Sequence, residues 1–171
     1  MGETALVIEV PEAGAFVSDW RQRHDPVAVL GMPAHITVLF PFAPPEALDG
    51  DDLRALTSIT SAVPQFEYEL TEVDQFPGAV WLRPTPDQPF RDLTSLLWTA
   101  FPEFPPYGGR FPDSQPHLTL CITADPVEQA DVASHIRDDF ARLLPIRCTA
   151  DAISVFTSDS RGVWSRQHRI E

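Results

Sequence analysis

Two short segments place a histidine two residues before a threonine within an apolar run. His35 precedes Thr37 in HITVLF, and His117 precedes Thr119 in HLTLCI. Because alternate side chains of a strand point to the same face, each histidine shares a face with its threonine. An imidazole exchanges protons near neutral pH, and a hydroxyl group donates hydrogen bonds to anionic oxygens. The two segments are therefore candidate halves of one catalytic site.

The two histidine–threonine pairs suit displacement at a phosphorus atom. In-line displacement requires a base at the attacking oxygen and an acid at the leaving oxygen, on opposite sides of phosphorus. His35 and His117, one neutral and one protonated in either order, would supply both groups, and each proton transfer contributes about 10²–10⁴ in rate. Thr37 and Thr119 would donate hydrogen bonds to the non-bridging oxygens as charge develops there. This chemistry needs no metal ion and no cofactor.

Strand alternation also assigns the apolar residues of both segments to faces. The face expected to pack on helices consists of Ile36, Val38 and Phe40 in the first segment. In the second segment it consists of Leu118, Leu120 and Ile122. Leu39 and Cys121 fall on the histidine faces. We therefore expect the two histidine faces to meet across a cleft.

Apolar periodicity and proline positions predict the elements that hold these segments. Strands are expected at 5–10, 35–40, 66–73, 79–83, 117–122, 148–156 and 162–169. Helices are expected at 12–23, 46–61, 90–101 and 127–143. The pattern predicts an α+β fold.

The two halves of the chain repeat each other. A shift of 82 positions places His35 on His117 and Val73 on Val155, and one further residue places VWLR at 80–83 on VWSR at 163–166. The shared order is strand, proline, helix, strand, turn, strand. We interpret residues 1–171 as one domain made of two similar lobes that pack as a pseudo-symmetric pair.

The repeated V-W-x-R supplies secondary candidates for substrate binding. Trp81 and Arg83 share one strand face, as do Trp164 and Arg166. A tryptophan can stack on a base, and an arginine can hold a phosphate with two hydrogen bonds. Alternatively, the tryptophans cover sheet edges and the arginines pair with surface carboxylates.

The segment 104–116 leads directly into His117 and is expected to be a loop. Tyr107 and Arg110 flank a Gly-Gly pair that permits unusual backbone angles. These two residues are candidates for contact with a substrate. The alternative is an ordinary connection between two elements.

Composition limits the classes of partner. The net charge is −13, so most of the surface would repel a long nucleic acid, and a phosphate-bearing substrate is expected to be a small nucleotide or cyclic phosphate. No apolar run reaches the roughly 18 residues of a membrane span. The two cysteines form no C-x-x-C motif, as in a cytoplasmic protein with reduced thiols. We expect a cytoplasmic monomer without a membrane partner.

The two motifs resemble those of a known superfamily. PAHITVLFPF at 33–42 and QPHLTLCI at 115–122 are similar to the paired signatures of the two-histidine phosphoesterases, nearest to their 2′-5′ RNA ligase-like, or LigT-like, branch. The similarity covers essentially the whole chain, including PYGG at 106–109. It implies a bilobal fold in which two antiparallel sheets line a central cleft, with helices outside. It also implies that His35 and His117 are catalytic and that Thr37 and Thr119 bind phosphate.

The resemblance leaves the reaction open. Members of the superfamily open 2′,3′-cyclic phosphates, ADP-ribose cyclic phosphate and other phosphodiesters, and some join RNA reversibly through 2′-5′ bonds. The pattern favours hydrolysis of 2′,3′-cyclic phosphates or related phosphodiesters of small nucleotides or RNA ends. The alternatives are a 2′-5′ RNA ligase, a phosphodiesterase of a specialised metabolite, and a nucleotide-binding module that lost turnover.

Overall fold

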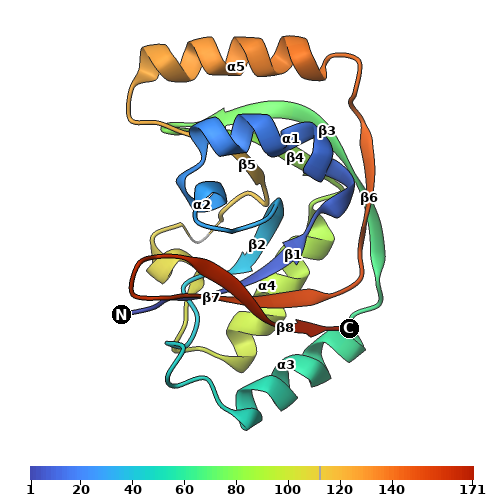
Figure 1. Cartoon of the computed structure of the whole chain (residues 1–171). Coiled ribbons are helices and arrows are strands. Elements are labelled where there is room, and N and C mark those ends of the chain that lie inside the picture. The colour runs from blue at the N-terminus through green and yellow to red at the C-terminus, as the bar shows by residue number, and fades with distance from the viewer. Residues whose placement is uncertain (112) are drawn as a thin grey trace.

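The computed structural model describes residues 1–111 and 113–171 and contains two four-stranded antiparallel sheets (Figure 1). Sheet A has the order β2-β1-β7-β8, with β1 (Thr4–Glu9), β2 (His35–Leu39), β7 (Ile153–Ser158) and β8 (Trp164–Ile170). Sheet B has the order β5-β4-β3-β6, with β3 (Phe66–Phe76), β4 (Ala79–Thr85), β5 (Leu118–Ile122) and β6 (Ile146–Ala150). The predicted α+β class with two antiparallel sheets is confirmed.

The helices lie against the two sheets in pairs. The helices are α1 (Pro11–His24), α2 (Pro26–Val29), α3 (Gly50–Ala62), α4 (Gln88–Ala100) and α5 (Pro126–Phe140), with a short 3₁₀ turn, η1 (Pro106–Gly109). α1 and α5 contact sheet B, whereas α3 and α4 contact sheet A (Figure 1). Asp49 and Asp125 cap α3 and α5, because their carboxylates accept hydrogen bonds from the first free backbone N–H groups. None of the helices in the described residues is long and apolar enough to cross a membrane.

One hydrophobic core joins both sheets. Leu6 and Ile36 from sheet A and Leu82 and Leu118 from sheet B are fully buried in the same cluster. At about 25 cal/mol per Å² of buried apolar surface, such a cluster is the main favourable term in folding. The two sheets therefore hold each other in place, and so do the histidines that they carry.

A β-bulge interrupts β2 directly after its threonine. The pairing with β1 shifts there, so that Val38 is an extra residue and Leu39 lies opposite Leu6. Leu39 is buried in the main core, and the prediction that it shares the histidine face is wrong. Phe40 packs in a separate cluster on the histidine face, not on the helices as predicted. The extra residue reverses the alternation of every side chain that follows.

A matching bulge interrupts β5 at the corresponding position. Leu120 is the extra residue between Thr119 and Cys121 in the pairing with β4. Cys121 is therefore buried in the core, whereas Ile122 is 48% exposed on the other side. The predicted faces of Cys121 and Ile122 are both wrong for this reason. The two bulges are separated by the same offset as the two histidine motifs of the sequence repeat.

Other predictions failed where the chain changes sheet. The strand expected at 148–156 is two strands, β6 in sheet B and β7 in sheet A, separated by Asp151 and Ala152. A single straight strand cannot pair in both sheets, so the chain bends between them. The V-W-x-R repeat also has no structural counterpart, because β4 lies beside the histidine strand β5, whereas β8 is the edge of sheet A farthest from β2.

Candidate active site

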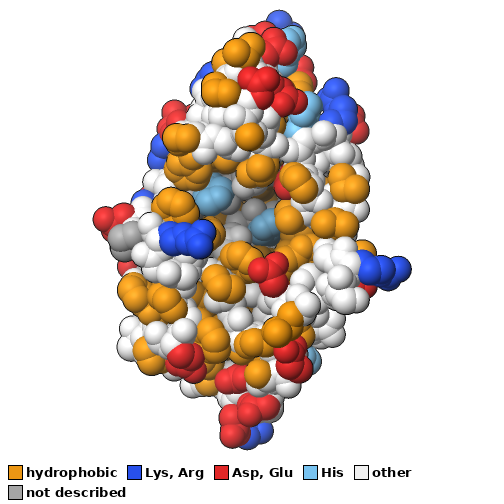
Figure 2. All heavy atoms as spheres, turned by 90° about the vertical axis from the view of Figure 1, so that its left-hand side faces the viewer, with side chains coloured by type: hydrophobic (Ala, Val, Ile, Leu, Met, Phe, Trp, Pro, Cys, Tyr) orange, Lys and Arg blue, Asp and Glu red, His pale blue; other side chains and the backbone are white. Residues whose placement is uncertain are grey.

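The two histidines lie at neighbouring strands of different sheets. His35 is the first residue of β2, and His117 directly precedes β5, which runs beside β2. Histidine side chains lie in a central hollow that is ringed by hydrophobic groups (Figure 2). His117 is close enough for its charge to lower the pKa of His35. The structure thus brings the two rings that the sequence selected close to each other.

Both imidazoles are held through the same nitrogen. Nδ1 of His35 lies 2.8 Å from the carbonyl oxygen of Pro33, and Nδ1 of His117 lies 2.6 Å from that of Gln115. A carbonyl oxygen only accepts hydrogen bonds, so Nδ1 carries the proton in both neutral rings. Nε2 is then the atom that can take up or release a proton at a substrate.

The two supporting carbonyls are fixed in different ways. Pro33 has a ring that restricts its own backbone. Gln115 is held by its side chain, which donates to Asp87 Oδ2 over 3.2 Å and accepts from Arg91 Nη2 over 3.1 Å. Arg91 Nε also donates to Asp87 Oδ2 at 3.0 Å. The start of α4 therefore holds the residue that orients His117.

Burial favours the neutral form of both imidazoles. It lowers the pKa of His35 to about 4, and the charges of Arg21 and His117 act in the same direction. The hydrogen bond to Pro33 and the charge of Glu9 oppose this shift. The pKa of His117 is also lowered by burial, against the hydrogen bond to Gln115.

Both motif threonines lie on the strands of their histidines, and Thr37 lines a pocket together with Tyr107. Thr37 and Thr119 are half-buried, one on each histidine strand. Tyr107 comes close to the first pair, because its side chain hydrogen-bonds Thr37 and its backbone N–H donates to Phe40 over 2.6 Å. Tyr107 has φ of +51°, a left-handed conformation that is uncommon outside glycine. This candidate from the sequence therefore contacts the site directly.

Trp81 packs beside His117, and Arg83 lies over Trp81. Trp81 is 1% exposed, and its ring lies 4.6 Å from that of Phe76 and 5.8 Å from that of His117. The Arg83 guanidinium lies over the Trp81 ring and forms ion pairs with Glu72 and Asp74. The guanidinium that was a candidate for phosphate binding is therefore paired with carboxylates, which is the alternative that the sequence analysis gave.

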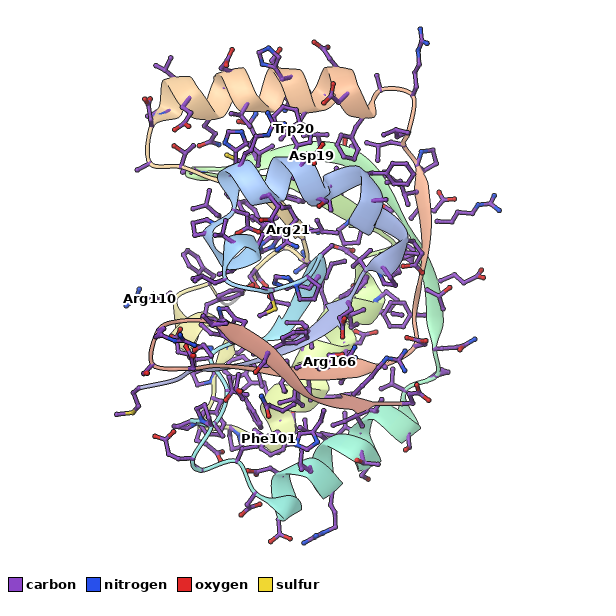
Figure 3. The ribbon with its side chains drawn as sticks, viewed as in Figure 1. Asp19, Trp20, Arg21, Phe101, Arg110 and Arg166 are labelled. Carbon is purple, nitrogen blue, oxygen red and sulfur yellow. The ribbon has the colours of Figure 1, made fainter. Side chains whose placement is uncertain are left out.

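The second V-W-x-R copy lies on β8, at the edge of sheet A opposite the histidine strand β2. Trp164 packs in an apolar cluster against Phe40. Arg166 lies on sheet A and donates to Glu9 Oε1 over 2.9 Å (Figure 3). Arg110 is exposed at the left-hand edge of the view in Figure 3, on the segment before β5.

A buried ion pair beside His35 was missed by the sequence analysis. Arg21 on α1 is 4% exposed, and its Nε and Nη2 both donate to Asp25 Oδ2, at 3.0 and 2.9 Å (Figure 3). Asp25 is 2% exposed and also caps α2. The signal was present as an arginine at the end of a predicted helix, four residues before an aspartate just beyond it, a spacing that brings the two side chains together.

Comparisons with known proteins agree with this geometry. Residues 10–162 match the family described as the 2′-5′ RNA ligase superfamily. Escherichia coli LigT bound to ATP has a TM-score of 0.59 and 17% identity, and the match covers 99% of this chain and 97% of LigT. The protein TT0787 of Thermus thermophilus has a TM-score of 0.62 and 16% identity, with 98% and 96% covered.

A structure described as a phosphoesterase has a TM-score of 0.59 and 18% identity, with 99% and 97% covered. No curated protein matches the chain significantly. The structural matches show a shared fold, and the family match spans most of the chain. This protein belongs to the 2′-5′ RNA ligase superfamily, the two-histidine phosphoesterases that its paired motifs resemble.

Proposed function

We propose that this protein is a metal-independent phosphoesterase that opens 2′,3′-cyclic phosphates or related diesters of small nucleotides. His35 and His117 would act as general base and general acid. The observation that carries the proposal is that the two rings lie near each other at neighbouring strands, each with Nδ1 bonded to a carbonyl, which leaves both Nε2 atoms for a substrate.

Thr37 and Thr119 would bind the phosphate. Each follows its histidine by two residues on a strand that borders the hollow. A hydroxyl donor aimed at a non-bridging oxygen gains strength as negative charge develops there, and losing one such donor costs about 10²–10³ in rate. Two donors from two sheets would hold the phosphorus between the rings.

A small substrate suits the charge of the protein. The net charge of −13 opposes binding of a long polyanion, since that binding depends on cationic side chains that replace counterions. E. coli LigT has been crystallised with ATP and with 3′-AMP, both of which are small nucleotides. We propose that the protein acts as a monomer on substrates of that size.

The test is turnover of a panel of cyclic phosphates and linear diesters in EDTA, followed by mass spectrometry. We expect each cyclic phosphate to give one product that is one water heavier, and each linear diester to give a phosphomonoester and an alcohol. The rate should fall by about 10²–10⁴ for His35→Ala and for His117→Ala. His135→Ala is the matched control, because His135 is an exposed histidine on α5. Loss of turnover in EDTA, or no turnover of any substrate, contradicts the proposal.

A further inference from the structure

A large apolar pocket opens beside His117. It has a volume of about 810 Å³, and its lining includes Phe76, Ala79, Ile122, Phe111 and Arg110. Pockets that bind small molecules have volumes of about 300–1,000 Å³. The pocket is therefore large enough for an organic group of nucleoside size, directly beside a candidate catalytic ring.

The equivalent region beside His35 is closed. The segment between α1 and β2 covers the histidine face of sheet A there. Val27, Leu30 and Met32 of this segment pack with Val7, Phe156 and Trp164. A second pocket reaches Thr37 but holds only about 160 Å³. Of these two pockets, the one beside His117 thus offers far more room for an organic group on a phosphate between the two rings.

The walls of the large pocket favour a planar aromatic group. The ring of Phe76 meets that of His117 edge-on at 5.1 Å and is supported from behind by Trp81. Phe111 and Ile122 are 60% and 48% exposed, so their apolar surfaces are open to a ligand. Aromatic groups bury large areas against such surfaces and stack on or meet other rings edge-on.

We propose that the substrate's aromatic alcohol part binds in this pocket, so that His117 protonates the leaving oxygen and His35 activates the attacking water. This inference rests on the proposed phosphoesterase function. In-line displacement places the leaving oxygen and the water on opposite sides of phosphorus. A leaving group in the pocket beside His117 therefore puts the water beside His35.

The reaction balances with these roles. The water oxygen forms a bond to phosphorus while its proton moves to Nε2 of His35. The bond between phosphorus and the ester oxygen breaks, and that oxygen takes the proton from Nε2 of His117. The products are a phosphomonoester and an alcohol, or one molecule carrying both groups if the diester is cyclic. Proton exchange with solvent then restores both rings.

The surroundings of the two rings agree with this assignment. Arg21 on α1 and His117 beside β5 add positive charge near His35, and only Glu9 on β1 opposes them among the described residues. A ring in this setting stays neutral and can accept a proton. Near His117 no comparable cation in the described part of the chain contributes to its pKa, and the negative charge of a bound phosphate would favour its protonated form.

Two matched esters separate the roles of the histidines. Methyl 4-nitrobenzyl phosphate and methyl 4-nitrophenyl phosphate have similar shapes, but only the first has a leaving oxygen that requires protonation. We expect His117→Ala to slow the nitrobenzyl ester by about 10²–10⁴ and the nitrophenyl ester by less than about tenfold. His35→Ala should slow both esters equally. The assignment is overturned if the nitrophenyl ester restores the rate of His35→Ala instead, or if His117→Ala slows both esters equally.

Pocket variants test where the aromatic group binds. Ile122→Asp places a charge on the exposed wall, and Val127→Asp is the control at an exposed residue of α5. We expect Ile122→Asp to raise KM about tenfold or more for adenosine 2′,3′-cyclic phosphate and for the nitrobenzyl and nitrophenyl esters, because a charge in an apolar wall opposes burial of an aromatic ring. The KM for glycerol 1,2-cyclic phosphate should not change. A uniform rise, or none, overturns the pocket assignment.

Failure of the proposed function gives a different result. If the wild-type protein turns over none of these four esters, the phosphoesterase function itself is contradicted. If the wild-type protein is active but its aromatic esters have no KM advantage over glycerol 1,2-cyclic phosphate, only the pocket assignment fails. Circular dichroism of each variant verifies that a loss of rate is not a loss of fold.

Discussion

The backbone carbonyl of Gln115 accepts a hydrogen bond from Nδ1 of His117 over 2.6 Å. The side chain of the same glutamine is hydrogen-bonded to Asp87 and Arg91 at the start of α4. The equivalent carbonyl beside His35 belongs to Pro33. One ring is thus oriented by a residue with a restricted backbone, and the other by a side-chain network. The two halves of the site have the same motif but different supports.

Removing the Gln115 side chain should disturb His117 alone. In Gln115→Ala the carbonyl loses its anchor, and a misplaced catalytic ring costs about ten- to hundredfold in kcat. The hydrogen bond raises the pKa of His117, so weakening it should shift the His117 limb of the pH–rate profile to lower pH. The profile of kcat against pH measures both effects.

The matched control is Gln167→Ala, at an exposed glutamine of β8 whose side chain bonds Ser165. It should leave rate and profile unchanged. Asp87→Asn should reproduce the Gln115→Ala shift in weaker form, because Asp87 accepts from both Gln115 and Arg91. A fall in rate at every pH with no movement of the limb contradicts the orienting role.

The threonines should contribute through their hydroxyl groups. Thr37→Val and Thr119→Val keep the shape but remove a hydrogen-bond donor, and each should lower kcat by about 10²–10³. Thr37→Ser and Thr119→Ser keep the donor and should retain most of the activity. Steady-state kinetics of these four variants decides the point. Equal losses in the serine and valine variants would indicate a packing role.

Acid should destabilise the protein through His35. In the unfolded chain this residue takes up a proton near pH 6.5, whereas in the folded protein burial delays protonation to about pH 4. Between these values the unfolded state binds more protons, so the free energy of unfolding falls as the pH is lowered from 6.5 to about 4. The contribution of His35 to the free energy of unfolding is fully present above about pH 6.5, the pKa of histidine in the unfolded chain.

Urea unfolding of the wild type and of His35→Gln measures this effect. Between about pH 6 and pH 5 the wild type should lose about 1 kcal/mol more than the variant, since one pKa unit corresponds to about 1.4 kcal/mol. Parallel curves for the two proteins in this interval contradict the assignment to His35.

The buried pair of Arg21 and Asp25 should be strongly coupled. Arg21→Met leaves the carboxylate of Asp25 buried without its cation, which costs about 3–5 kcal/mol. Adding Asp25→Asn should recover part of this loss, because the amide carries no charge and its oxygen can still cap α2. Arg161→Ala breaks an exposed pair with Asp159 and should cost at most about 1 kcal/mol. Equal costs for the two arginine variants in urea unfolding would contradict the coupling.

The sequence was sufficient for the histidine strands but not for their bulges. The expected bounds of β2 and β5 differ by one residue from the observed ones, because apolar alternation and flanking prolines define both. The bulges leave no such signal. Both residues after each threonine are apolar, as in Leu120 and Cys121, so either register buries a hydrophobic side chain.

Contacts between distant segments also lay outside what the sequence reveals. Gln115 opens the second motif, but its partner Asp87 lies 28 residues earlier and outside either motif. The segment that closes the His35 side has apolar residues without helix or strand periodicity, so its covering role emerges only from its packing in the fold. The paired motifs specify the chemistry, whereas the asymmetry around them depends on tertiary structure.

Sheet A joins strands from both ends of the chain, which affects folding during synthesis on the ribosome. The strand that carries His35 is made early, but its sheet also requires β7 and β8, which span residues 153–170. Chains generally fold from the N-terminus as they emerge. Here β1 and β2 are made first but their sheet is completed last, so a nascent chain that ends at residue 152 holds both histidines and all four strands of sheet B, but only two of the four strands of sheet A.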